Sequence, residues 1–205
     1  MESEAKALTH DTPQEKAALR KRIQAELKAM TPEERAAAAL HACTLLEKQA
    51  VWRDAKAILF FAPLPCEPDL WRLVEDSLTA GKAVALPRFH REHGTYVAAL
   101  IENTHAHINL GEFGVREPHA DCATVELNRL DLMLVPGVAF DLDGHRLGRG
   151  KGFYDRLLEK FGGVACGVAF DQQIVARVPR EKHDARLNCI LTPTRWHEVP
   201  KHARF

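Results

Sequence analysis

The sequence has no net charge and no long hydrophobic run. Its 205 residues include 28 lysines and arginines against 28 aspartates and glutamates. Proteins dedicated to nucleic acids or anionic membranes usually carry a surplus of positive charge, so we expect neither partner here. The longest uncharged apolar stretch covers nine residues, 132–140, and contains Pro136, whereas a membrane-spanning helix needs about 20. We therefore predict no membrane helix, and any anion-binding site must be local.

The sequence also lacks the features of an exported protein. Five cysteines are scattered along the chain without a C-x-x-C pair, so they indicate neither a disulfide framework nor a zinc knuckle. The first 16 residues mix Glu, Lys, His and Asp, where a secretory signal would place a basic end followed by an apolar block. We therefore expect reduced cysteines and a cytoplasmic location.

Histidine is abundant, with 11 residues, but it lacks the partners of a metal site. The pairs His90/His93 and His105/His107 are closely spaced, yet no cluster of cysteines or carboxylates accompanies them at the spacing of metal ligands. Such spacings alone are weak motifs, so we interpret these residues as solvated loop histidines.

Two helices are predicted near the N-terminus. Between Gln14 and Met30, apolar residues recur at steps of four, four and three, which places them on one helical face. The segment Thr31–Glu34 then combines an N-cap, a proline at the first helical position and a capping-box glutamate. A second helix, rich in alanine, is therefore expected to run to about Gln49.

Further along the chain, short apolar runs alternate with helical patterns. Strands are predicted at residues 55–62, 83–86, 96–101, 130–136 and 164–170, and helices at 68–80 and 153–161. Strands that are apolar on both faces belong in a parallel sheet covered by helices on two sides. We predict an α/β fold with three layers and a mostly parallel central sheet. The sequence shows no repeat or linker, so we expect a single domain over 1–205, with 1–13 as a flexible extension.

Residues 141–155, DLDGHRLGRGKGFYD, form the most unusual segment, because glycines alternate with cationic side chains. The segment lies between the strand ending at Pro136 and the helix beginning near Phe153. Glycine-rich backbone N–H groups can approach an anion closely, and the helix N-terminus that follows attracts negative charge. With three cations in the loop, the segment suits a polyphosphate. Those cations are Arg146, Arg149 and Lys151.

The two common phosphate motifs do not fit this segment. A Walker A loop would need glycine at His145 and a serine or threonine after Lys151. In the dinucleotide fingerprint the third glycine would fall on Phe153. A solvated glycine turn therefore remains an alternative. Asp155 can either stabilise the helix N-terminus or hold a divalent cation that bridges phosphates.

The stretch PGVAFD at 136–141, followed by GHRLGRGKGFYD at 144–155, resembles the signature of the 5-formyltetrahydrofolate cyclo-ligase family, whose members are also called methenyltetrahydrofolate synthetases. The likeness extends to KAALR at 16–20, to 61–67, to 86–89, and to Val178-Pro179 with His183-Asp184, so it spans nearly the whole chain. It implies a fold like that of the NagB/RpiA/CoA-transferase group.

The resemblance implies an ATP- and Mg²⁺-dependent cyclisation of 5-formyltetrahydrofolate to 5,10-methenyltetrahydrofolate, with release of ADP and phosphate. A formamide oxygen is a poor leaving group, so transfer of the γ-phosphoryl group to it must precede attack by N10. The protein then positions two small-molecule substrates and neutralises phosphate charge. We expect a monomer.

The resemblance also assigns the nucleotide and metal sites. The residues implied to bind ATP are Lys16, Arg20, Arg146, Gly148, Arg149, Gly150, Lys151, Gly152 and Tyr154. Among these, Arg149, Lys151 and Tyr154 are the implied catalytic residues, and Asp155 and Asp184 are the implied Mg²⁺ ligands. Taken alone, Lys16 and Arg20 are equally an exposed basic stripe, and Asp184 is equally a turn residue.

For the folate, the resemblance implies a site of Phe61, Ala62, Glu67, Phe113 and Tyr154. A buried carboxylate such as Glu67 can accept hydrogen bonds from the pterin edge, although a charge near the start of the following helix is the alternative. The aromatic residues are alternatively core residues.

Three positions depart from the family pattern. Phe153 stands where a tyrosine is more common, Cys66 where glycine is expected and Asn188 where an aspartate is common. Two competing functions remain: a non-catalytic folate- or nucleotide-binding homologue on the same scaffold, and a sugar-phosphate isomerase or acyl-carrier transferase that needs no ATP.

Overall fold

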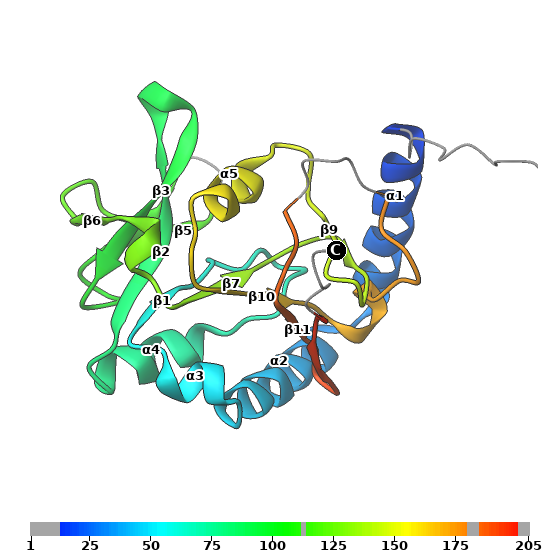
Figure 1. Cartoon of the computed structure of the whole chain (residues 1–205), viewed down its shortest axis with the longest axis horizontal. Coiled ribbons are helices and arrows are strands. Elements are labelled where there is room, and N and C mark those ends of the chain that lie inside the picture. The colour runs from blue at the N-terminus through cyan, green and yellow to red at the C-terminus, as the bar shows by residue number, and fades with distance from the viewer. Residues whose placement is uncertain (1–12, 112–113, 180–184, 201–205) are drawn as a thin grey trace, which may run out of the picture.

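An eight-stranded sheet forms the centre of the computed structural model, which describes residues 13–111, 114–179 and 185–200 (Figure 1). The strand order is β12-β11-β10-β7-β1-β2-β3-β6. The five strands from β11 to β2 are parallel, while β12, β3 and β6 pair antiparallel at the two sides. The strands are β1 Ala57–Leu59, β2 Ala83–His90, β3 Thr95–Ile101, β6 Thr124–Val125, β7 Leu132–Val135, β10 Val164–Val168, β11 Cys189–Leu191 and β12 Trp196–Glu198. The predicted α/β fold with a mostly parallel sheet is confirmed.

Helices cover both faces of this sheet (Figure 1). One face carries α2 Pro32–Glu47, α3 Ala50–Asp54 and α4 Trp71–Thr79, and the other carries α5 Phe153–Glu159. Successive side chains of a strand point to opposite faces. In β7, Leu132 and Leu134 accordingly pack with α2–α4, whereas Met133 and Val135 pack with α5. This double burial explains why β7 is apolar at every position.

The first helix, α1 Pro13–Ala29, packs beside the sheet rather than on either face. Its buried residues Ile23 and Leu27 contact the hairpin of β8 Ala139–Phe140 and β9 Arg146–Leu147. The predicted apolar stripe of this helix is therefore confirmed, and it holds α1 against the segment that leads to the glycine-rich loop.

The start of α2 has the predicted capping box. The Glu34 backbone N–H donates to Thr31 Oγ1 at 3.1 Å, and the Thr31 N–H donates to Glu34 Oε2 at 2.8 Å. Two helix N-terminal donors are thereby satisfied, which fixes the boundary between α1 and α2.

Several elements differ from the sequence-based prediction. β2 continues past residue 86 to His90 and forms a long hairpin with β3 through the short 3₁₀ helix η1 Arg91–His93. Pro87 is tolerated there because β1 pairs with β2 only over residues 83–85, so the proline lies where β2 extends past β1. A small hairpin of β4 Ile108–Leu110 and β5 Arg116–Pro118 lies between the predicted strands 96–101 and 130–136, in a stretch for which no element was predicted. Two further 3₁₀ helices are η2 Leu127–Arg129 and η3 Asp171–Gln173.

Within the described ranges, no helix combines the length and apolar character needed to cross a membrane.

Candidate functional site

The candidate site is a cavity of about 410 Å³ beyond the carboxyl ends of β1 and β7. Its walls include Ala62 and Glu67 from the segment after β1, Pro136 after β7, and much of the segment 146–155. In parallel α/β sheets, ligands bind in the crevice outside the carboxyl ends of the strands. The glycine-rich segment singled out in the sequence therefore lies at the place where this architecture binds ligands.

A buried carboxylate holds the first part of the glycine-rich segment in shape. The Asp141 side chain accepts backbone N–H groups from Asp143, His145 and Val178, at 3.1, 2.9 and 2.9 Å. It also contacts His145 Nδ1 at 3.1 Å. Because both carboxylate oxygens already accept hydrogen bonds, we interpret Asp141 as a residue that stabilises the β8–β9 turn rather than as one that binds a ligand.

The loop from Gly148 to Gly152 connects β9 to α5. Gly150 has a φ of +97° and Gly152, the N-cap of α5, has a φ of +64°. Residues other than glycine rarely adopt these backbone conformations, so the path of the loop depends on both glycines. The loop ends at the N-terminus of α5. There the first backbone N–H groups of the helix lack intrahelical partners, and the helix dipole has its positive end.

Helix α1 contacts this loop through Arg20. The Arg20 Nε donates to the Gly148 carbonyl oxygen at 2.9 Å, although 128 positions separate the two residues. Lys16 is half-buried one helical turn earlier. The predicted basic pair therefore lies on the helix that borders the loop, and its Arg20 member touches the loop directly.

Arg149 and Glu67 form an ion pair at the cavity. Arg149 Nη2 lies 3.0 Å and Nε 3.3 Å from Glu67 Oε1, and Nη2 also contacts Cys66 Sγ at 3.3 Å. The other Glu67 oxygen accepts the Leu64 N–H at 3.0 Å. Although burial opposes it, the hydrogen bond that Arg149 donates to Cys66 Sγ and the charge of Glu67 raise the pKa of Arg149, so the guanidinium stays charged. The side chain of Glu67 is only 6% exposed, against 39% for Arg149.

Arg146 and Asp155 form a second ion pair at the same cavity. The Arg146 Nη2 lies 2.5 Å from Asp155 Oδ1, and the guanidinium stacks at 5.8 Å from the Tyr154 ring centre. The Arg146 side chain is 5% exposed, whereas that of Asp155 is 38% exposed. The residue predicted to bind phosphate and the residue predicted to bind metal are therefore paired with each other. Asp155 keeps the more accessible position.

Tyr154 and Phe153 differ sharply in their surroundings. Tyr154 lines the cavity and packs against core residues on both faces of the sheet. Burial, reinforced by the negative charge of Glu67, raises its pKa well above the ordinary value. Its hydroxyl is therefore a protonated donor at neutral pH. Phe153 packs edge-on against Phe89 at 5.8 Å and Tyr96 at 4.8 Å. The phenyl ring at position 153 is thus part of an aromatic cluster with Phe89 and Tyr96.

Most of the predicted site residues line this one cavity. They are Ala62, Glu67, Arg146, Gly148, Arg149, Lys151, Gly152, Tyr154 and Asp155. Gly150 lies in the same loop. Phe61 does not line the cavity: it is 4% exposed and packs in the core beneath α2–α4, as the alternative interpretation held. Phe113 and Asp184 lie outside the described residues.

The departure at position 188 also has a structural reason. Asn188 Oδ1 accepts the Ala165 N–H at 2.8 Å, which ties the segment before β11 to β10. An amide oxygen serves this bond as well as a carboxylate oxygen does. Asn188 is not among the residues that line the cavity.

The sequence analysis missed one wall of the cavity. Tyr96 from β3 and Arg116 from β5 also line it. The Arg116 guanidinium lies 3.8 Å from the Trp71 ring centre and its Nη2 3.6 Å from Asp69 Oδ2. No local pattern marks these residues, because β5 is a three-residue strand in a polar stretch.

Proteins of a known family are similar to this chain in sequence and in fold. The pattern of the 5-formyltetrahydrofolate cyclo-ligase family matches residues 12–193. The chain is 32% identical to the 5-formyltetrahydrofolate cyclo-ligase of Escherichia coli strain K12 over 180 residues, which cover 86% of this chain and 99% of that protein. It is 30% identical to that of Mus musculus over 196 residues, covering 86% and 92%. The NMR structure of Aquifex aeolicus 5,10-methenyltetrahydrofolate synthetase matches with a TM-score of 0.83 and 29% identity, over 93% of this chain and 95% of that one.

Proposed function

Because the chain belongs to the 5-formyltetrahydrofolate cyclo-ligase family and is an enzyme of that class, we propose that it converts 5-formyltetrahydrofolate to 5,10-methenyltetrahydrofolate with ATP and Mg²⁺. One observation carries the proposal. A single cavity joins a buried carboxylate, Glu67, to the cationic glycine loop that ends at α5. The reaction needs such an arrangement, since the formyl oxygen of the folate must meet the γ-phosphoryl group of the nucleotide.

Glu67 supports the folate end of the proposal. Its side chain is nearly buried, and one oxygen already accepts the Leu64 N–H. The pterin edge presents N–H donors, which bind strongly to an ionised carboxylate away from water. The oxygen now bonded to Arg149 is therefore the acceptor that a pterin would share or take over.

The loop supports the nucleotide end. Lys151 is exposed at the cavity rim, Arg149 reaches into it, and Arg20 contacts the loop carbonyl from α1. Together with the N-terminus of α5, these groups supply the fixed positive charge that a triphosphate requires. Of the predicted cations, Arg146 differs in being paired with Asp155: its side chain is 5% exposed, although the residue lines the cavity.

The chemistry is a phosphoryl transfer followed by ring closure. The formyl oxygen attacks the γ-phosphorus, the bond from phosphorus to the β,γ-bridging oxygen breaks, and ADP leaves. Attack by N10 on the formyl carbon, with the N10 proton passing to the departing phosphate, then breaks the bond from that carbon to the phosphorylated oxygen and closes the ring as the methenyl cation. Arg149 and Lys151 stabilise charge on the transferred group, while Tyr154, which stays protonated, donates a hydrogen bond within the cavity.

The residues present fit a magnesium ion. Mg²⁺ keeps several waters and usually binds through one or two carboxylates together with substrate phosphates. Asp155 offers such a carboxylate, since its side chain is 38% exposed at the cavity and Arg146 bonds only one of its oxygens among the contacts described. When bound, the ion would neutralise phosphate charge. Asp184, the second expected ligand, lies outside the described residues and stays a prediction.

The proposal is tested by mixing protein, 5-formyltetrahydrofolate, ATP and Mg²⁺ and following the absorbance of methenyltetrahydrofolate. We expect product only when all components are present, with one ADP formed for each product. ATP and folate binding without product would instead support the non-catalytic homologue, and absence of ATP binding would contradict the ligase mechanism.

The remaining expectations stay predictions. A monomeric state, a cytoplasmic location and a single domain over 1–205 rest on the sequence. Gel filtration with light scattering tests the first of these.

A further inference from the structure

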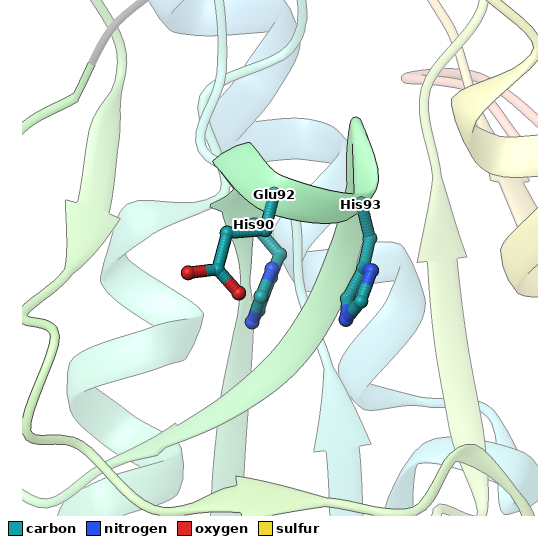
Figure 2. Close-up of side chains that lie close together, drawn as sticks. All are labelled: His90, Glu92 and His93. Carbon is teal, nitrogen blue, oxygen red and sulfur yellow. The ribbon is translucent and has the colours of Figure 1, made fainter.

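Two histidines and a glutamate meet at the tip of the β2–β3 hairpin, outside the residues that line the cavity (Figure 2). His90, Glu92 and His93 each offer one ligand atom, and all these atoms lie within 4.8 Å of one another. Neither the phosphoryl transfer nor the folate site uses them.

The local backbone gathers these three residues. His90 ends β2, and η1 then turns the chain through Arg91–His93 before Gly94, whose φ is +57°. A 3₁₀ turn has three residues per turn, so residues i and i+3 lie on one side. His90 and His93 accordingly stack, with ring centres 4.5 Å apart and an interplanar angle of 17° (Figure 2).

The cluster has the accessibility of a binding site. Glu92 and His93 are exposed, while His90 is half-buried. The His90 Nδ1 is buried and has no hydrogen-bond partner among the described residues. A buried polar atom without a partner is costly. A cation bound to this nitrogen, once the half-buried ring turns it toward Glu92 and His93, would remove that cost.

We propose that His90, Glu92 and His93 bind a divalent transition-metal ion of the Zn²⁺ type. Two imidazoles and one carboxylate are ligands typical of Zn²⁺, and three protein ligands leave a coordination position for water. Because His93 and Glu92 are exposed, their side chains can rotate to direct lone pairs onto one ion. Mg²⁺, which prefers oxygen ligands, does not suit this set. The site is thus chemically distinct from Asp155.

The site lies at the tip of the same hairpin that carries Tyr96, a residue of the cavity wall. Phe89 and Tyr96 pair across the same hairpin just below the tip and pack edge-on against each other at 5.5 Å. Both contact Phe153, the first residue of α5. A metal ion at the tip would therefore stabilise the hairpin that carries Tyr96.

The spacing H-x-E-H alone did not indicate this site. Any short polar turn can hold such residues close together in the chain, and only the 3₁₀ geometry shows that their ligand atoms lie within 4.8 Å of one another.

The test is calorimetric titration of Zn²⁺ into chelator-treated full-length protein, in the absence of nucleotide and folate. We expect saturable binding that persists in excess Mg²⁺. His93→Ala should weaken it at least about tenfold, because even the loss of a group that only orients a ligand costs that much. Glu92→Gln should weaken it less. In NMR spectra, substoichiometric Cu²⁺ should broaden the ring signals of His90 and His93 before those of other histidines.

His41→Ala is the matched control, since His41 is an exposed histidine on α2, away from the hairpin. It should leave the affinity for Zn²⁺ unchanged. Equal affinity in wild type and His93→Ala, an equal loss in His41→Ala, or displacement of Zn²⁺ by Mg²⁺ would each overturn the proposal. Circular dichroism of each variant establishes that it is folded. None of these outcomes depends on ligase activity.

Discussion

The guanidinium of Arg149 and the carboxylate of Glu67 meet across the candidate site, with Nη2 3.0 Å from Oε1, although 82 positions separate the two residues. This contact joins the loop proposed for ATP to the carboxylate proposed for folate. Under the proposed roles, a pterin that takes over Glu67 would make Arg149 available for phosphate. We therefore expect the two substrates to bind with positive coupling.

Glu67→Gln tests the folate half of this relationship. The amide keeps the shape of the side chain but loses the charge, and charge-assisted hydrogen bonds contribute about 1.5–3 kcal/mol. We expect kcat/KM for 5-formyltetrahydrofolate to fall about 10- to 100-fold in steady-state assays, with a smaller effect on the KM for ATP. Glu75→Gln, on the exposed side of α4, is the control. Equal losses for both substrates would argue against a folate role.

Arg149→Ala tests the nucleotide half. Removing a donor that stabilises developing charge costs about 10²-fold in kcat. We expect a loss of that size in single-turnover rates, with Arg149→Lys restoring little, because an ammonium cannot reproduce the forked geometry of the guanidinium. Arg129→Ala, at an exposed arginine in η2, should leave the rate unchanged. A full rate in Arg149→Ala would remove this residue from the mechanism.

Asp155→Asn should separate the metal role of Asp155 from its pairing with Arg146. The amide oxygen can still accept from Arg146 Nη2, whereas the charge that attracts a cation is lost. We expect the Mg²⁺ concentration for half-maximal activity to rise, with little change in the thermal midpoint measured by circular dichroism. Asp143→Asn, in the exposed β8–β9 turn, is the control. An unchanged Mg²⁺ profile would exclude Asp155 as a ligand.

The buried thiol of Cys43 leads us to expect a lower free energy of unfolding at alkaline pH. Burial is the main cause that raises the pKa of its thiol from 9.0 to about 11 in the folded chain. The folded state therefore keeps this proton while the unfolded state loses it, so the free energy of unfolding should be constant below about pH 9 and fall between about pH 9 and 11.

Urea unfolding at several pH values measures this effect. Cys43→Ala removes the titrating group, so the alkaline fall in stability should become shallower even though the variant loses some packing. The same slope in both proteins would show that other groups govern the alkaline limit.

Local sequence patterns were sufficient for the fold class and for singling out the glycine-rich loop that lines the cavity. β7 is apolar at every position because both faces are buried, and Thr31 with Glu34 fixes the start of α2 through contacts three residues apart. The glycines and cations of 148–152 are likewise neighbours in the chain. The cationic, glycine-rich character of this segment could therefore be recognised from the sequence, without knowing which residues surround it.

Other features depended on residues that are distant in sequence. The four-residue spacing predicted that Lys16 and Arg20 share a helical face, but only the packing of Ile23 against the β8–β9 hairpin places Arg20 at Gly148. The core position of Phe61 likewise follows from which face of the sheet its side chain meets.

The sequence by itself determined an α/β protein with a glycine-rich, cationic loop before the helix that begins near Phe153, because periodicity, capping and glycine content are local properties. Tertiary structure alone decided that Arg146 holds Asp155, that Arg149 reaches Glu67, and that Arg116 completes the cavity wall. Those pairings depend on which side chains the packed core brings within hydrogen-bond distance. Distance in space follows from the burial of apolar faces rather than from position in the chain.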